Sequence, residues 1–317
     1  MRDFKSYLSK SKKEDPTPYS MSYPVLLMCP PFNLSSGEPN NIFMKKLAPN
    51  ERKVDKNKAM RQFLGLYNYV SDLAMVYLIP HVDGLQDQSF VANLGIVLPH
   101  FGNGKTVVIS EFKSPPRVEE QRPGVDFFHM LGYDVRIAPK YFEGEADLKY
   151  FNNNNYIGAY GIRTSIDALN WFEREFDMNV VKVENTNEQL YHLDCCVYQL
   201  YSNKCLAVTS MLSSKNKRDI EKFAEIIPLP KNIDPAGVTN CIGLYKTLIC
   251  ASNIDELKVT DENYKSERDK VDFLTKVCAQ HSLEPIFFNL SEYSKNGADL
   301  SCMFMHLNYS RMMEILD

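Results

Sequence analysis

The stretch CCVYQLYSNKCLAVTS, Cys195 to Ser210, opens a segment that contains one complete structural unit. Two runs of apolar and β-branched residues flank the polar turn SNK, and this pattern predicts a β-hairpin. The segment NKRDIEKFAEII then places apolar residues at helical spacing, and IIPLP adds a third short apolar run. The expected order is therefore strand, strand, helix, strand.

The same order recurs along the whole chain. Amphipathic segments typical of helices start roughly 50 residues apart, a spacing typical of internal repeats. They begin at Lys58, Val118, Ser165, Asn216 and Ser266. Each is followed by a short apolar piece, and paired strand-like runs lie between them. A doubly wound parallel sheet has few hairpins, so the repeated hairpins argue against that fold.

Two strand-like runs at the ends of the chain lack a neighbour. YPVLLMCPPF, from Tyr23, has no strand before it, and LSCMFMHL, from Leu300, has none after it. A ring in which the first and last strands share a sheet supplies both partners. The sequence therefore predicts an α/β fold of five ββαβ-type units around a pseudo-fivefold axis. Residues 1–20 are expected to be a flexible lead-in and residues 21–317 a single domain.

Composition excludes several classes of protein. The 317 residues are 44% hydrophobic and 24% charged, which is typical of a soluble globular protein, and the net charge of -4 gives no reason to expect nucleic acid. No apolar run approaches the roughly 18 residues of a membrane helix, and the polar N-terminus lacks the apolar core of a secretory signal. The eight cysteines have no zinc-ligand spacing. We expect a cytoplasmic protein with reduced thiols, no metal and no cofactor.

A ring of this kind brings polar groups from separate units into one central pocket. In LYHLDCCVYQL, His192 and Asp194 are expected on one face of a strand, since side chains two apart on a strand share a face. A histidine paired with an acid in the core would explain this pattern equally well. LSCMFMHL places Cys302 on another strand, and YFEGEADLKY carries three carboxylates. Thiol, imidazole and carboxylate together can perform nucleophilic catalysis.

Five motifs, in order, resemble the guanidino-group-modifying superfamily, the penteins. They are DQSFVANLG, FEGEAD, GIRT, YHLD and KNGADLSC. The resemblance covers the chain from about Cys29 to the C-terminus. It is strongest to the amidinotransferase or arginine dihydrolase-like branch, which is related to arginine deiminase and dimethylarginine dimethylaminohydrolase. It implies the pentein α/β-propeller fold.

The resemblance also implies a role for each matching residue. Cys302 would attack the guanidinium carbon, His192 would be the general acid and base, and Glu143 would pair with His192 or with the guanidinium. Asp194 would hold guanidinium nitrogens. The other implied substrate-binding residues are Asn93, Asn41 (with Asn40 as the alternative register), Asp147, Arg163, Arg117 and Asp87. Arg163 would suit a substrate carboxylate, which a guanidinium binds through two parallel hydrogen bonds.

The implied function is a cysteine-dependent hydrolase acting on arginine or an arginine derivative through a thiouronium-like intermediate. Asn93 stands where arginine deiminases carry Asp, which favours ornithine over citrulline as the product. Two alternatives remain open. An amidinotransferase would pass the amidino group to an acceptor amine, and a non-catalytic scaffold would resemble the ribosome anti-association factor that shares this fold. The expected partner is a small guanidino compound, with neither nucleic acid nor membrane, and a homo-oligomer stays open.

The sequence departs from the family pattern at two positions. Ala146 stands where the branch usually has Gly, and Glu111 where it often has Arg. A Cβ at position 146 narrows the backbone conformations open to the acidic loop. These departures are expected to affect the substrate more than the chemistry.

Overall fold

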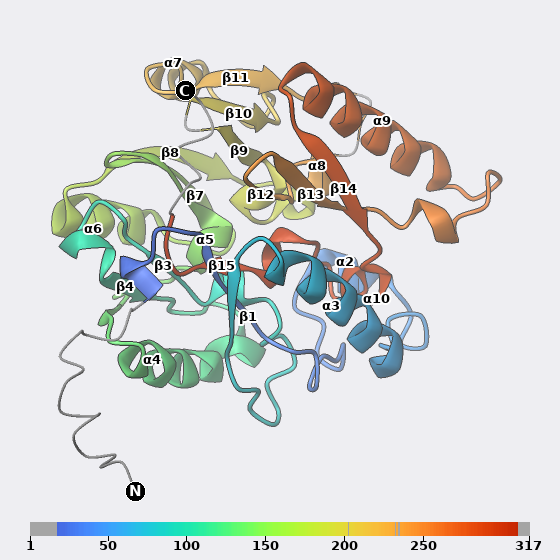
Figure 1. The fold of residues 1–317 in the computed structure, drawn as a ribbon, viewed down its shortest axis with the longest axis horizontal. Coiled ribbons are helices and arrows are strands. Elements are labelled where there is room, and N and C mark those ends of the chain that lie inside the picture. The colour runs from blue at the N-terminus through green and yellow to red at the C-terminus, as the bar shows by residue number, and fades with distance from the viewer. Residues whose placement is uncertain (1–17, 202, 232, 234, 310–317) are drawn as a thin grey trace, which may run out of the picture.

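Five small sheets surround the centre of the protein and helices cover the outside, as a computed structural model of the chain shows (Figure 1). The structure describes residues 18–201, 203–231, 233 and 235–309. The flexible lead-in predicted for residues 1–20 therefore lies, up to residue 17, outside the described residues.

Each sheet has three strands, of which two are antiparallel and the third is parallel to its neighbour. The sheets are β15 (Met305–His306), β1 (Val25–Met28) and β2 (Met75–Leu78); β3 (Gly95–Val97), β4 (Thr106–Ile109) and β5 (Asp134–Ile137); β6 (Leu148–Asn152), β7 (Asn155–Gly161) and β8 (Asn179–Asn185); β9 (Val197–Tyr201), β10 (Lys204–Ala207) and β11 (Glu225–Pro228); and β12 (Ile242–Leu244), β13 (Thr247–Ala251) and β14 (Glu284–Phe288).

The two ends of the chain close the ring. β1 pairs antiparallel with β15, with Leu26 opposite His306 and Leu27 opposite Met305. On its other edge β1 pairs parallel with β2. The prediction that the first and last strands share a sheet is confirmed.

A helix connects the second and third strands of each sheet. These helices are α3 (Lys56–Ser71), α4 (Gln121–Met130), α6 (Ile166–Phe176), α7 (Ser214–Ile220) and α9 (Tyr264–Gln280). α3 begins where the Asp55 carboxylate accepts hydrogen bonds from the Asn57 and Lys58 amides, which lack partners within the helix. α7 is shorter than the sequence predicts, because Ile226 and Ile227 pair with β10 as part of β11.

Other short helical segments lie between these elements or, for η1, before β1. They are η1 (Pro18–Ser20), α2 (Ile42–Lys46), η3 (Gly102–Gly104), η4 (Pro115–Glu120), η5 (Glu188–Leu190), η7 (Ile254–Glu256) and α10 (Ser291–Ser294). None of the helices in the described residues is long and apolar enough to cross a membrane.

A short helical turn lies at the start of each sheet. These turns are η2 (Val91–Asn93), α5 (Gly144–Asp147), η6 (Leu193–Cys195), α8 (Pro235–Val238) and η8 (Ser301–Met303). Successive turns contact one another: η8 lies against η2, η2 against α5, α5 against η6, and η6 against α8. A Cβ on Gly144, whose φ is +60°, would stand 2.3 Å from the Ala92 carbonyl oxygen, so only glycine permits this approach of α5 to η2.

The prediction that His192, Asp194 and Cys302 lie on strands is wrong. His192 precedes η6 and Asp194 lies within it, while β9 starts only at Val197. Cys302 lies in η8, before β15. The Cys196 amide donates to the Leu193 carbonyl at 2.8 Å, so this backbone is folded into a turn despite its strand-like composition. His192, Asp194 and Cys302 therefore lie on, or next to, these short helical turns.

Candidate active site

The thiol of Cys302, on the turn η8, is buried. Its Sγ lies 3.6 Å from Asp194 Oδ2 and 3.7 Å from Asn240 Nδ2. Burial raises the pKa of the Cys302 thiol, and the negative charge of Asp194 raises this pKa further. The thiol is therefore protonated at neutral pH in the unliganded protein, and a cation bound beside it would favour the thiolate.

Asp194 presents a carboxylate to this thiol. Its Oδ2 also accepts a hydrogen bond from Ser301 Oγ at 3.0 Å, and its backbone carbonyl accepts from Thr239 Oγ1 at 2.8 Å. The side chain is 1% exposed, and it forms no ion pair with any residue that the structure describes. A buried carboxylate without a cationic partner is a site for a cationic ligand.

His192 is held by a second acid. Its Nε2 donates to Glu143 Oε2 at 2.8 Å, and Glu143 is fully buried. Burial alone raises the carboxyl pKa, but the charges of Arg163 and His192 outweigh it and bring the pKa of Glu143 down to about 2. Asn93 Nδ2 lies 3.3 Å from the same imidazole nitrogen. Nε2 carries the hydrogen that is donated to Glu143 and so cannot accept a hydrogen bond. The amide oxygen of Asn93, rather than its nitrogen, is therefore the atom suited to face the ring.

Arg163 and Arg117, the two arginines predicted to bind substrate, already form hydrogen bonds with other residues of the protein. Arg163 Nη1 lies 3.2 and 3.1 Å from the two oxygens of Glu143, and its Nη2 donates to the Asn40 carbonyl at 2.9 Å. Arg117 donates to Glu120 through Nε at 3.0 Å and Nη2 at 2.7 Å. Burial raises the pKa of Glu120 to about 7, although the charge of Arg117 lowers it. A substrate carboxylate would share or displace these partners.

Asp147, the third acid of FEGEAD, holds the backbone next to His192. Asp147 Oδ2 accepts from Thr164 Oγ1 at 2.6 Å, and its Oδ1 accepts from the Leu193 amide at 3.2 Å. Burial raises the pKa of Asp147 to about 6, although the charge of His192 and the bond from Thr164 lower it. Asp147 thus ties α5 to the turn that carries His192.

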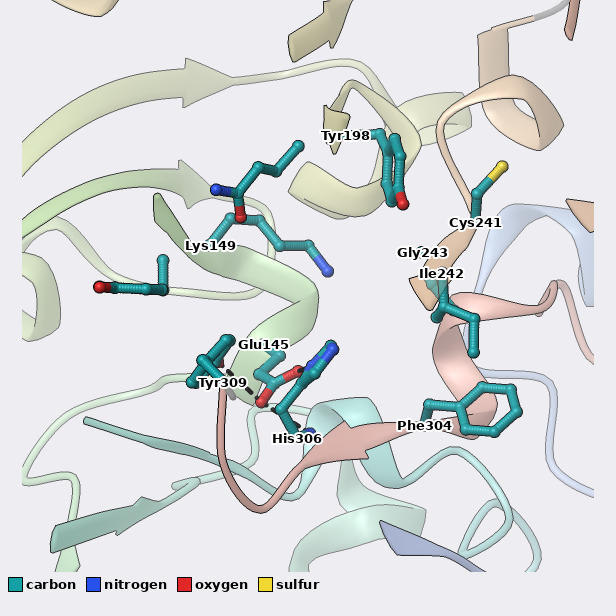
Figure 2. Close-up of a pocket in the computed structure, with 12 residues that line it drawn as sticks. Glu145, Lys149, Tyr198, Cys241, Ile242, Gly243, Phe304, His306 and Tyr309 are labelled. Atoms are coloured by element: carbon teal, nitrogen blue, oxygen red, sulfur yellow. Dashed lines mark hydrogen bonds and ion pairs between the residues drawn. The ribbon is translucent and has the colours of Figure 1, made fainter. Parts of the chain in front are cut away.

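Glu145, the middle acid of the same motif, faces a different cavity. Its carboxylate accepts from His306 Nδ1 at 2.7 Å and from Tyr309 Oη at 3.0 Å. Figure 2 shows these three side chains together at the edge of a small cavity, into which Lys149 points. Cys302 and His192 do not line this cavity.

One small pocket gathers most of the predicted residues. It is lined by Cys302, His192, Asn93, Asn41, Asp87, Arg117 and Arg163, together with Asn40, Phe90, Tyr191, Asn296 and Ala298. Glu143 and Asp194 reach this pocket through their contacts with His192 and Cys302. Asp147 does not line it. No group of metal-binding side chains was found among the described residues.

Sequence reasoning missed Asn240. Its Oδ1 accepts from the Ser301 amide at 2.7 Å and its Nδ2 faces the Cys302 thiol, so this side chain holds the turn that carries Cys302. A signal was present: each unit has a polar or thiol side chain within three residues of the start of its first strand. The five positions are Asn93, Asp147, Asp194, Asn240 and Cys302.

Residues 31–252 match the model of the family described as N,N dimethylarginine dimethylhydrolase, eukaryotic. The bifunctional arginine dihydrolase/ornithine cyclodeaminase AgrE of Nostoc sp. is 31% identical over 198 residues, 62% of this chain and 27% of that protein. The N(G),N(G)-dimethylarginine dimethylaminohydrolase of Mycobacterium tuberculosis is 28% identical over 193 residues, 60% of each chain. The chain thus spans about a quarter of the length of AgrE.

A solved structure shows the same fold. It is a single-substitution variant of the N-terminal domain of ArgZ, an arginine dihydrolase from cyanobacteria, covalently bound to a reaction intermediate. The TM-score is 0.76 at 22% identity, covering 90% of this chain and 97% of that domain. The predicted ring of five units is confirmed.

Proposed function

Because the chain belongs to the eukaryotic N,N-dimethylarginine dimethylhydrolase family, and so to the pentein superfamily, we propose that it is a hydrolase of guanidino groups. Its substrate is arginine or an arginine derivative, and Cys302 is the nucleophile. The observation that carries this proposal is the pocket that holds the Cys302 thiol, a buried Asp194 carboxylate without a cationic partner among the described residues, and a His192–Glu143 pair. The covalent intermediate of the ArgZ domain supports a covalent mechanism.

The substrate guanidinium sits against Asp194, with its carbon facing Sγ of Cys302. Its positive charge offsets the effects that raise the thiol pKa, so binding promotes the thiolate, and the thiol proton leaves to solvent. The thiolate then attacks the carbon and a C–S bond forms. His192 donates a proton to the departing nitrogen, the C–N bond breaks, and ammonia or an amine leaves.

Water completes the first round. It attacks the thiouronium carbon while His192 takes a proton from it, and the C–S bond breaks to release a ureido product and the thiol. Glu143 keeps the imidazole oriented. Asn240, whose amide nitrogen faces Sγ, would donate to the thiolate.

We propose a second round on the ureido product. Asn93 puts a neutral amide where a deiminase has a carboxylate, and an amide can donate a hydrogen bond to a ureido oxygen. Attack on that carbon and hydrolysis release a second ammonia, carbon dioxide and ornithine, with two waters consumed in all. The naming of AgrE and ArgZ as arginine dihydrolases supports this outcome over citrulline.

Amidino transfer to an acceptor amine shares the first half of this reaction, and a non-catalytic scaffold shares only the fold. Relatives named as hydrolases favour hydrolysis. We also propose that the protein works in the cytoplasm, since its eight cysteines are all free and buried.

Incubation with arginine, and separately with N-methylated arginines, tests the proposal. Ammonia, methylamines, citrulline and ornithine are measured for the wild type and for Cys302→Ala. We expect product from the wild type and none from the variant. Turnover by the variant would exclude Cys302 as the nucleophile. A requirement for an added amine would establish transfer, and a wild type inert towards every guanidino compound would leave the scaffold.

A further inference from the structure

The cavity of Figure 2 is separate from the pocket of Cys302, and the two share no lining residue. Its walls come from β6, β9, β12 and β15, each of which follows one of the short helical turns. Ser301 also lines this cavity, and its Oγ donates to Asp194 Oδ2 at 3.0 Å. The cavity therefore borders the turn that carries Cys302, yet no residue assigned to the substrate lines it.

Two polar groups face this cavity without a partner among the described residues. Lys149, in β6, points into the cavity (Figure 2), and its Nζ forms no hydrogen bond or ion pair with any residue that the structure describes. The hydroxyl of Tyr198, in β9, has no hydrogen-bond partner among those residues either, although this side chain is 7% exposed. Buried polar groups nearly always have a partner, so these open groups point to one that a ligand supplies.

Gly243 keeps space open in front of the Tyr198 hydroxyl. A Cβ at this position would stand 2.8 Å from Tyr198 Oη. Gly243 pairs with Leu248 in the ladder of β12 and β13, and its φ is not in the left-handed region, so the backbone does not require glycine here. The missing side chain instead leaves room beside the hydroxyl for an atom of a ligand.

The acid at the edge of the cavity does not neutralise Lys149. Glu145 is 4% exposed, and its carboxylate accepts hydrogen bonds from the His306 amide at 3.0 Å, from His306 Nδ1 at 2.7 Å and from Tyr309 Oη at 3.0 Å. Within the described part of the chain, no ion pair joins Glu145 to Lys149, and no other acid lines the cavity. The ammonium is therefore suited to a negatively charged acceptor, with which its hydrogen bonds are strongest.

The side of the cavity across from Lys149 is apolar. Ile242, in β12, and Phe304, just before β15, lie there (Figure 2), and the space between them and the ammonium is small. A ligand that satisfies both sides has an anionic group at one end and a short hydrocarbon part at the other, since burial of apolar surface against these two side chains is favourable.

We propose that this cavity binds a short-chain aliphatic monocarboxylate, such as propionate. The carboxylate accepts hydrogen bonds from Lys149 Nζ and Tyr198 Oη, and the hydrocarbon part packs on Ile242 and Phe304. This is a second ligand site, distinct from the substrate pocket, and it requires no activity of Cys302.

Calorimetric titration of the full chain with propionate at pH 7 tests this proposal. A ligand of this size reaches a Kd of about 0.1–10 mM in a fitting site. For Lys149→Met we expect the Kd to rise at least about tenfold, because a charge-assisted hydrogen bond is lost. The matched control is Lys105→Met, which removes an exposed lysine outside the cavity and should leave the Kd unchanged. Equal affinity in Lys149→Met and the wild type, or a wild type that binds no propionate at these concentrations, would overturn the proposal.

A second variant and three competitors test the position and the charge. Gly243→Val fills the space beside Tyr198 Oη and should also weaken binding at least about tenfold. An unchanged Kd there would contradict the proposed position of the carboxylate. Propylammonium and 1-propanol keep the hydrocarbon part but lack the negative charge, and chloride has the charge but no hydrocarbon part. Displacement of propionate by any of the three at equal concentration would show that the site does not select a carboxylate.

An acid of the chain itself is the other occupant to test. Residues 310–317 follow Tyr309 and contain Glu314 and Asp317. The full chain with Glu314→Gln and Asp317→Asn should bind propionate with the Kd of the wild type. Binding by this variant alone would show that one of these acids occupies the site, and would refute a free carboxylate as the ligand. None of these measurements needs turnover, so a protein inert towards guanidino compounds would leave this inference standing.

Discussion

Replacing Glu143 by Gln should destabilise the protein markedly at neutral pH. The substitution keeps the size of the side chain but removes the charge that faces Arg163 Nη1 at 3.1 Å and His192 Nε2 at 2.8 Å. Arg163 is 9% exposed, so its guanidinium would be left buried without its carboxylate. Removing one partner of a buried ion pair costs about 3–5 kcal/mol of unfolding free energy.

The size of the thermal shift follows from the length of the chain. An unfolding entropy of about 2.1 cal/mol/K per residue gives about 0.7 kcal/mol/K for this chain, so we expect the Tm to fall by about 5–8 °C. The assay is thermal unfolding at pH 7, with Glu145→Gln as the matched control. Glu145 is paired with His306, which can become neutral, so its variant should fall by less than half as much.

The pH dependence gives a second measure of the same pair. A Glu has a pKa of about 4.3 in the unfolded chain, and the pKa of Glu143 is lowered to about 2 in the fold. The stabilisation is therefore complete above pH 4.3 and is lost as the pH falls through about 2. The gap between wild type and Glu143→Gln should narrow over this range.

Two results would refute this reasoning. A Tm within about 1 °C of the wild type would mean that Arg163 turns out into the neighbouring groove that it also lines, where water stabilises its charge. A gap that stays constant down to pH 2 would mean that the carboxylate charge is not what stabilises the fold. Combining Glu143→Gln with Arg163→Met should recover part of the lost stability, because the buried, unpaired charge of Arg163 is then removed.

Three further outcomes are expected. Cys302→Ala should abolish product formation yet lower the unfolding free energy by less than about 2 kcal/mol, since only a small cavity is left; urea unfolding measures this. Asn93→Asp should shift the product from ornithine towards citrulline, because a carboxylate favours the cationic guanidinium over the neutral ureido group; citrulline from the wild type would refute this. Alkylation of Cys302 by iodoacetamide should rise about tenfold per pH unit between pH 7 and 9, since burial raises the thiol pKa, and a rate independent of pH would contradict a protonated thiol.

The sequence by itself determined the order of the fold and the identity of most residues in the pocket. Hairpin turns, helical spacing and short apolar runs are local patterns, and the five units follow from them. The closure of the ring was also predictable, because the runs at Tyr23 and Leu300 each lacked a neighbour and β1 pairs with β15. The motif residues Cys302, His192 and Asn93 could be selected because their order along the chain matched a known family.

Only the tertiary structure decided which acid forms a hydrogen bond with which partner. Glu143, Glu145 and Asp147 lie within five residues of one motif, yet they bind His192, His306 and Thr164, respectively. These partners are 17 to 161 positions away, so local patterns carry no information on the choice.

The sequence did not reveal the short helical turns that precede the first strand of each sheet either. Apolar composition predicted strands at His192 and Cys302, but the packing of five turns against one another folds the backbone there, and strands start only after them. Asn240 is identified as part of the site only by its contacts with Ser301 and Cys302, which lie in another unit. Propensity reflects the nearest few residues, whereas the pocket is built from contacts across the ring, and only folding brings those contacts together.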